Sequence, residues 1–134
     1  MNLRMRIVFL LLGALALTGS AWAETWLTSE TRPGGLLVHL QSESEPVRLN
    51  QMHRWRVLVQ DAEGVPVEGL GIEVDGGMPA HDHGLPTQPA VQPHPEPGMY
   101  WLEGMRFHMA GEWTLDLLLV HEGRRYRAAF QFDL

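Results

Sequence analysis

The sequence predicts an all-β fold, a small antiparallel β-sandwich of immunoglobulin-like type, and three observations support this prediction. Apolar side chains recur at every second position in several segments, which is typical of half-buried strands. Turn-forming pairs such as Glu63-Gly64 and Glu122-Gly123 separate these segments. No segment between them has a convincing helical pattern. Short strands joined by regular turns favour an antiparallel sandwich.

In the first half of the chain, strands are expected at residues 35–42 and 46–50, following the Gly34-Gly35 turn. The alternation is clearest in residues 53–60, where one face consists of His53, Trp55, Val57 and Val59. A further strand is expected at residues 70–75, ending at the Gly76-Gly77 pair, which we interpret as a turn.

In the second half, a strand is expected at residues 99–104, after Pro97-Gly98. The next, residues 112–121, is apolar on both faces over part of its length, as expected near the centre of a sandwich. The last strand, residues 124–132, has one face made of Tyr126, Ala128, Phe130 and Phe132.

The N-terminal segment has the pattern of an export signal. Arg4 and Arg6 precede an apolar run, and Ala21-Trp22-Ala23 provides the small residues of a cleavage site. The run is shorter than the roughly 20 residues of a spanning helix. We therefore expect a cleaved signal peptide at 1–23, a mobile lead-in at 24–34 and one domain at 35–134, secreted into a bacterial periplasm. Retention of the signal as a membrane anchor is the alternative.

Charge and composition narrow the function. Eight of the ten arginines and all sixteen acidic residues lie after residue 23, which gives this part a net charge of −8 and argues against nucleic acid as a partner. The chain has no lysine and no cysteine, so Schiff-base and thiol catalysis are excluded. No serine stands in a nucleophile turn, and no HExxH motif occurs. The sequence therefore predicts a protein that is not an enzyme.

A proline-rich connection, residues 79–97, carries the strongest candidate for a binding site. His81 and His83 lie two residues apart behind Met78. In an extended segment their attachment points would be about 6.6 Å apart, at about 3.3 Å per residue, and both rings would point the same way. Thioether sulfur favours the soft cuprous ion. If His108 and Met109 lie nearby, the five residues together would hold a copper ion.

Simpler interpretations stay open for the same residues. A His-x-His pair in an exposed loop often binds no metal. Met109 alternates with Phe107, so both could pack in the core and leave His108 exposed. His53 shares a face with Trp55, which favours a partly buried histidine with a hydrogen-bond partner. Trp113 is most simply a core residue.

Two segments, MPAHDHGLPTQP and GMRFHMAGEW, resemble the YtkA-like domain, a small exported or membrane-tethered bacterial module related in style to the FixH proteins. The resemblance spans about residues 35–132. It implies an immunoglobulin-type sandwich and, by association, copper handling and respiratory oxidase assembly. The histidine pair of the family corresponds to His81 and His83, and its Phe-x-Met-x-Gly stretch to Phe107, Met109 and Gly111. FixH proteins keep a membrane helix that this chain is expected to lose.

Two functions follow as hypotheses. The first is a periplasmic protein that buffers copper or delivers it to a membrane copper-handling or oxidase assembly protein. The second is a β-sandwich interaction module that docks on a membrane complex without metal, with the histidine loop as a rigid recognition element.

Overall fold

The computed structural model describes residues 26–134 and is built almost entirely of strands. The only helical element in this range is one 3-10 turn, Pro79–His81. The strands are β1 Leu27–Glu30, β2 Leu36–Ser42, β3 His53–Asp61, β4 Gly71–Met78, β5 His83–Gly84, β6 Ala90–Pro93, β7 Met99–Met105, β8 Glu112–His121 and β9 Arg124–Asp133. The expected signal peptide at 1–23 lies outside the described residues.

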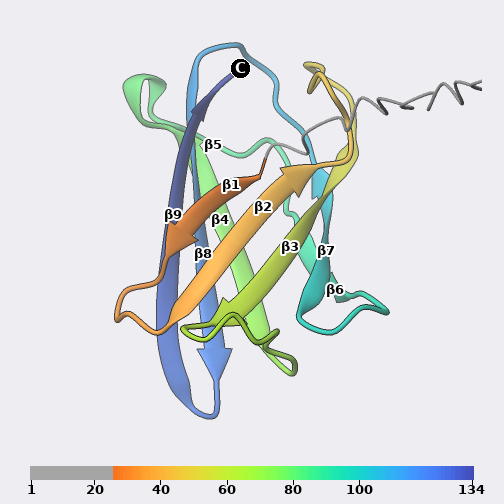
Figure 1. The fold of residues 1–134 in the computed structure, drawn as a ribbon. Coiled ribbons are helices and arrows are strands. Elements are labelled where there is room, and N and C mark those ends of the chain that lie inside the picture. Colours follow the sequence, from red (N-terminus) through yellow and green to blue (C-terminus); the bar gives the residue numbers. More distant parts are fainter. Residues whose placement is uncertain (1–25) are drawn as a thin grey trace, which may run out of the picture.

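The strands form two antiparallel sheets packed face to face (Figure 1). One sheet has the order β1-β2-β3-β7-β6 and the other the order β5-β4-β8-β9. The predicted all-β sandwich of immunoglobulin-like type is confirmed. Residues 26–134 include no helix with the length and hydrophobicity that crossing a bilayer requires.

The core lies between the sheets, where the period-two pattern places one face of each long strand. On β3 the buried residues are Trp55, Val57 and Val59. On β8 they are Trp113, Leu115, Leu117 and Leu119, all fully buried. Because β8 pairs with β4 on one side and β9 on the other, its central position agrees with its largely apolar sequence. Trp113 is the core residue that the sequence indicated.

Two expectations about the N-terminal half are wrong. Residues 46–50 are not a strand: β3, which follows them in the chain, already has β2 and β7 on its two edges, so they cannot pair with it. They cross one end of the sandwich instead, where the Asn50 amide donates to the Phe107 carbonyl at 2.7 Å. Within the lead-in, β1 pairs with β2 from Leu27↔Leu40 to Glu30↔Leu37, so residues 27–30 belong to the sheet.

The proline-rich connection is also more regular than expected, because it contains β5 and β6. β6 pairs with β7, and β5 folds back on β4. Three connections and the end of β9 meet at one end of the sandwich, the upper end in Figure 1. These are the β2–β3 loop, the β4–β5 hairpin and the β7–β8 turn. The candidate ligands therefore lie on neighbouring connections.

Tyr100 joins β7 to the segment before β4. Its hydroxyl donates to the Val67 carbonyl at 3.0 Å and accepts from the Leu70 amide at 3.2 Å. Burial raises the pKa of the Tyr100 phenol, the Leu70 hydrogen bond opposes this, and the charge of Glu68 adds to the rise. The folded state thus favours the neutral phenol.

We expect Tyr100→Phe to lower the free energy of unfolding by about 1 kcal/mol near neutral pH, because two partly buried backbone groups lose their partner. A raised folded-state pKa contributes stability below the unfolded value of about 10, and this contribution is lost as pH rises through the folded pKa. The difference in free energy of unfolding between wild type and Tyr100→Phe should therefore become smaller above about pH 10. Urea unfolding at neutral and alkaline pH measures it; a constant gap would contradict the assignment.

Candidate metal centre

The β4–β5 hairpin carries the histidine pair. Met78 is the register partner of His83, and Gly77 that of Gly84, so the chain reverses within residues 79–82. It does so through the 3-10 turn and Asp82, whose φ of 51° is left-handed. The expected extended conformation of residues 81–83 is wrong, because direct pairing of Met78 with His83 requires this reversal.

The two rings nevertheless face each other. The ring centres of His81 and His83 are 6.2 Å apart, with an angle of 15° between their planes. Both residues are exposed. The hairpin therefore produces a stacked imidazole pair by a different backbone path from the expected one.

His108 arrives from the β7–β8 turn. Its ring centre lies 5.8 Å from that of His83 and 5.5 Å from Trp113, both edge-on. Its Nδ1 atom is buried and, within the described residues, has no hydrogen-bond partner. The structure thus brings together His81, His83 and His108, and the His83 ring contacts both of the others.

The two methionines lie on the core side of these rings. Met78 is 1% exposed and belongs to the hydrophobic core. A Cβ atom placed on Gly111 would lie 3.0 Å from the Met78 Cε atom, so the hairpin packs closely on the β7–β8 turn. Met109 is partly buried and packs against the core, in line with the packing alternative. It follows His108 directly, and its carbonyl accepts from Trp113 Nε1 at 3.0 Å.

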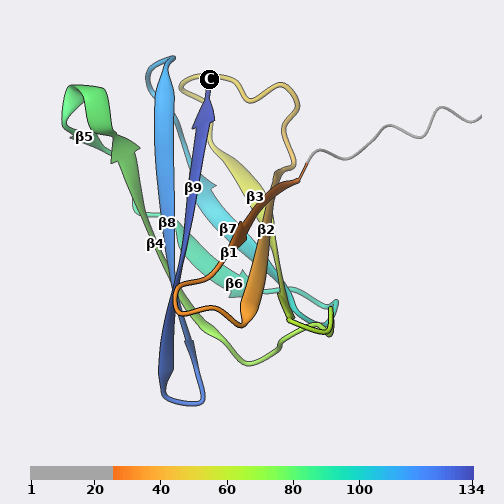
Figure 2. The same cartoon turned by 60° about the vertical axis from the view of Figure 1, so that its left-hand side comes forward.

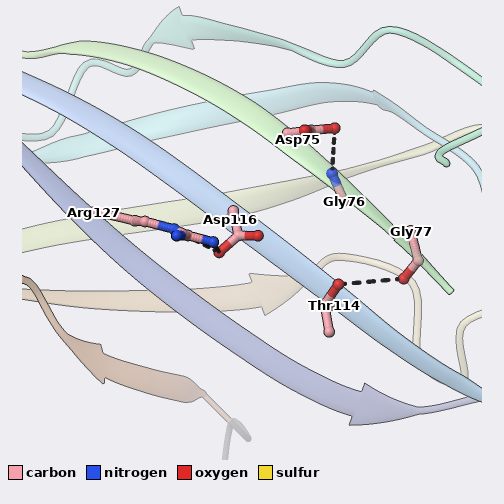
Figure 3. Close-up of polar contacts among 6 residues, drawn as sticks. All are labelled: Asp75, Gly76, Gly77, Thr114, Asp116 and Arg127. Carbon is pink, nitrogen blue, oxygen red and sulfur yellow. Dashed lines mark hydrogen bonds and ion pairs between the residues drawn. The ribbon is translucent and has the colours of Figure 1, made fainter. Parts of the chain in front are cut away.

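Cross-strand contacts hold the base of the hairpin on β8 (Figure 3). The Thr114 hydroxyl of β8 donates to the Gly77 carbonyl of β4 at 3.4 Å. Within β4, the Gly76 amide donates to the Asp75 carboxylate at 2.8 Å. Asp75 lies directly opposite Asp116. Arg127 offsets this repulsion with a salt bridge of 2.9 Å to Asp116.

The Gly76-Gly77 pair is the positioning feature that the sequence interpretation missed. Both glycines lie inside β4, not in a turn. A Cβ atom on Gly77 would lie 2.2 Å from the His83 carbonyl, and one on Gly76 would lie 2.4 Å from the Thr114 carbonyl. Only glycine permits this approach of β5 and β8 to the same stretch of backbone. Adjacent glycines next to the candidate ligands were the available signal.

The other histidines of the described segment have structural surroundings. His39 hydrogen-bonds Thr28 and Gln60. His53 Nδ1 donates to the Gln51 carbonyl at 3.0 Å, which is the hydrogen-bond partner expected for this histidine. His94 packs on the Trp101 ring, and His121 is the last residue of β8.

Within residues 26–134, no three side chains of the types His, Cys, Asp and Glu are arranged as a set that could hold a metal ion. Thioether sulfur is a further donor type, which Met78 and Met109 would add. A metal ion at the three rings would therefore need methionine sulfur, a modest movement of the rings, or both. The arrangement is an open cluster of donors.

The fold and the cluster together define the class of protein: a small β-sandwich that carries imidazole and thioether groups at one end. A family model described as YtkA-like matches residues 32–117. The chain belongs to the YtkA-like family. No curated protein and no solved structure matches it.

We expect Gly77→Ala to destabilise the fold by about 1–3 kcal/mol, because the new methyl group overlaps the His83 carbonyl. The hairpin should also move, so the ring-to-ring contact of His83 and His108 should weaken. Thermal unfolding and nuclear Overhauser effects between the two rings measure both effects.

Gly84→Ala is the matched control. Gly84 is the register partner of Gly77, yet the nearest atom to a Cβ placed there is 3.9 Å away. If the two variants behaved alike, the close approach at Gly77 would not be what positions the hairpin.

Proposed function

We propose that this protein is an exported, non-enzymatic metal-binding protein that buffers or delivers copper. The observation that carries the proposal is the meeting of His83 and His108 from two separate connections, with ring centres 5.8 Å apart. Histidines brought together by tertiary packing are a stronger indication of a site than His81 and His83 alone, which are neighbours in sequence.

The ring separations are compatible with a shared ion. A metal ion about 2.0–2.1 Å from an imidazole nitrogen lies about 3.2 Å from the ring centre, so two rings that share it have centres at most about 6.4 Å apart. The separation of His83 and His108, 5.8 Å, falls within this limit, and their planes are 70° apart. The His81 ring is stacked on His83 at 6.2 Å and 15°, so it would have to turn before its nitrogen reached the same ion. The buried, unpartnered Nδ1 of His108 supports the same conclusion, because such an atom costs about 1–3 kcal/mol unless a ligand or water meets it.

The donor set favours copper over zinc or magnesium. Imidazole nitrogen suits copper and zinc, whereas thioether sulfur selects Cu(I). His81, His83 and His108 would supply nitrogen, and Met78 and Met109 would supply sulfur. With no cysteine in the chain, sulfur coordination depends on these methionines.

Export and partners belong to the same proposal. The signal pattern at 1–23 supports a periplasmic location. Association of the family with copper handling supports delivery to a membrane copper-handling or oxidase assembly protein. Two of the three imidazoles are exposed, so an ion held there would be accessible to a receiving protein.

A second candidate function is an interaction module without metal. It is favoured by the fact that no three His, Cys, Asp or Glu residues of the described chain are arranged as metal ligands. The stacked rings of His81 and His83 would then act as a recognition surface. Metal titration distinguishes the two candidates.

We expect the chain after removal of the signal to bind one equivalent of copper, measured by competition with a chelator of known affinity. The His81→Ala, His83→Ala double variant should lose this site, and His108→Ala should weaken it about tenfold or more, equivalent to about 1.4 kcal/mol. His121→Ala, at the opposite end of β8, is the control. Equal binding by wild type and double variant would favour the interaction module.

We expect Met78→Leu to weaken Cu(I) binding and leave Zn(II) binding nearly unchanged, because only the soft ion gains from thioether sulfur. Met78 is buried, so the substitution should cost under about 1.5 kcal/mol in stability. Met99 is another buried methionine, so Met99→Leu is the control for the effect of a core methionine-to-leucine change on packing. Parallel loss of Cu(I) and Zn(II) affinity would mean that Met78 acts through packing alone.

A further inference from the structure

β9 lies at the edge of the β5-β4-β8-β9 sheet. β9 pairs with β8 in one unbroken register, from Glu112↔Asp133 to His121↔Arg124. Just beyond it, Leu134 exchanges two hydrogen bonds with Gly111, at 2.9 and 3.0 Å. Alternate residues of an antiparallel strand direct their backbone groups to opposite edges. The even-numbered residues of β9 therefore bond to β8, and the odd-numbered ones face the free edge.

Among residues 26–134, only the lower part of that edge is covered. Arg127 exchanges two backbone hydrogen bonds with Arg32, at 2.8 and 2.9 Å. Above this bridge β1 and β9 diverge toward the end of the sandwich that holds the histidines (Figure 2). Within the described chain, no strand pairs with the backbone groups of Ala129, Gln131 and Asp133 on this side. Such an edge is a template for an added strand.

An apolar groove of about 350 Å³ lies beside the same stretch. Its apolar lining includes Leu27, Leu40, Val47, Trp55 and Phe132. The lining of the groove is thus mainly apolar. The Trp55 Nε1 atom is buried and meets no acceptor among the described residues.

The charged side chains of the groove are both acidic. Glu45 and Asp133 line it, and no basic side chain does. A basic residue on an incoming segment would therefore be favoured there, and an acidic one would be repelled.

We propose that the upper part of the β9 edge is a docking site for an extended segment of another protein, added as a fifth strand to the β5-β4-β8-β9 sheet. Backbone pairing with Ala129, Gln131 and Asp133 spans five residues of β9. Alternate apolar side chains of the segment enter the groove, and an arginine or lysine lies beside Glu45 and Asp133. Strand addition of this kind takes affinity from the backbone and specificity from alternate side chains.

The position of this edge links it to the metal cluster. Leu134 bonds to Gly111, which belongs to the same turn as His108 and Met109. A protein docked on β9 would therefore be held at the end of the sandwich where the candidate ligands lie. The docking edge and the ligand cluster share no residue, so each can be tested without the other.

The test uses a defined peptide, acetyl-Arg-Thr-Val-Thr-Val-Thr-amide, added to the metal-free chain. Its arginine and both valines lie on one face of an extended strand. Amide chemical shifts and hydrogen exchange are followed by NMR. In the free chain the amides of Ala129, Gln131 and Asp133 should exchange faster than those of Ala128 and Phe130. With the peptide bound, the three fast amides should become protected. Uniformly slow exchange in the free chain, or shifts confined to other strands, would overturn the proposal.

Gln131→Pro removes one backbone donor from the free edge and leaves the β8 ladder intact, as proline allows on an edge strand. It should weaken peptide binding about tenfold or more, and Gln131→Ala, which keeps the donor, should not. Copper binding by Gln131→Pro should equal that of wild type, which separates this proposal from the proposed metal function. Equal peptide affinities for the two variants would overturn it.

If Gln131→Pro fails to fold, a peptide methylated at alternate backbone nitrogens replaces that variant. This peptide is added to the wild-type protein, so the test does not depend on a variant that folds. Methylation of the amides that face β9 should abolish binding, and methylation of the other set should not. Replacement of the arginine by aspartate should also weaken binding. If sedimentation showed a dimer of the chain, and Gln131→Pro made it a monomer, the edge would bind a second copy of the chain. That result would overturn the proposal that another protein binds there.

Discussion

The burial of Trp113 is the interaction on which the candidate centre depends. Its side chain is fully buried at the start of β8, and its indole N–H donates to the Met109 carbonyl at 3.0 Å. Its ring contacts Phe107 at 5.0 Å and His108 at 5.5 Å between ring centres. The β7–β8 turn is therefore tied to the core through one side chain, so His108 has the rigidity of the core and not that of a free loop.

The hairpin side of the cluster is held by backbone proximity. Gly76 and Gly77 let the carbonyls of Thr114 and His83 approach β4 more closely than any side chain permits, and Met78 then packs against Gly111. Hairpin and turn are thus locked together beneath the rings. Donors that are already close lose less conformational entropy when a ligand binds, and this favours binding.

Particular residues show how far sequence interpretation reached. The period-two pattern predicted β3 and β9 well, because each strand has one face in the core and one outside it. It predicted a strand at 46–50, where the chain instead crosses the end of the sandwich. It missed β1, β5 and β6, which are four residues or fewer in length and too short to show a period. The Gly76-Gly77 pair predicted a turn, because adjacent glycines are more common in turns than inside strands. In the structure, the pair lies inside β4.

The sequence by itself determined the sandwich, its long strands and the donor chemistry, with histidine and methionine available and cysteine absent. These properties are local, since alternation follows from the pleat of a single strand and donor type from the side chain alone. Only the tertiary structure decided that His83 meets His108 and that Met78 lies in the core. It also decided that, within residues 26–134, no strand pairs with the β9 edge above Arg127. Each of these depends on how segments distant in sequence pair and pack, and no local pattern encodes that geometry.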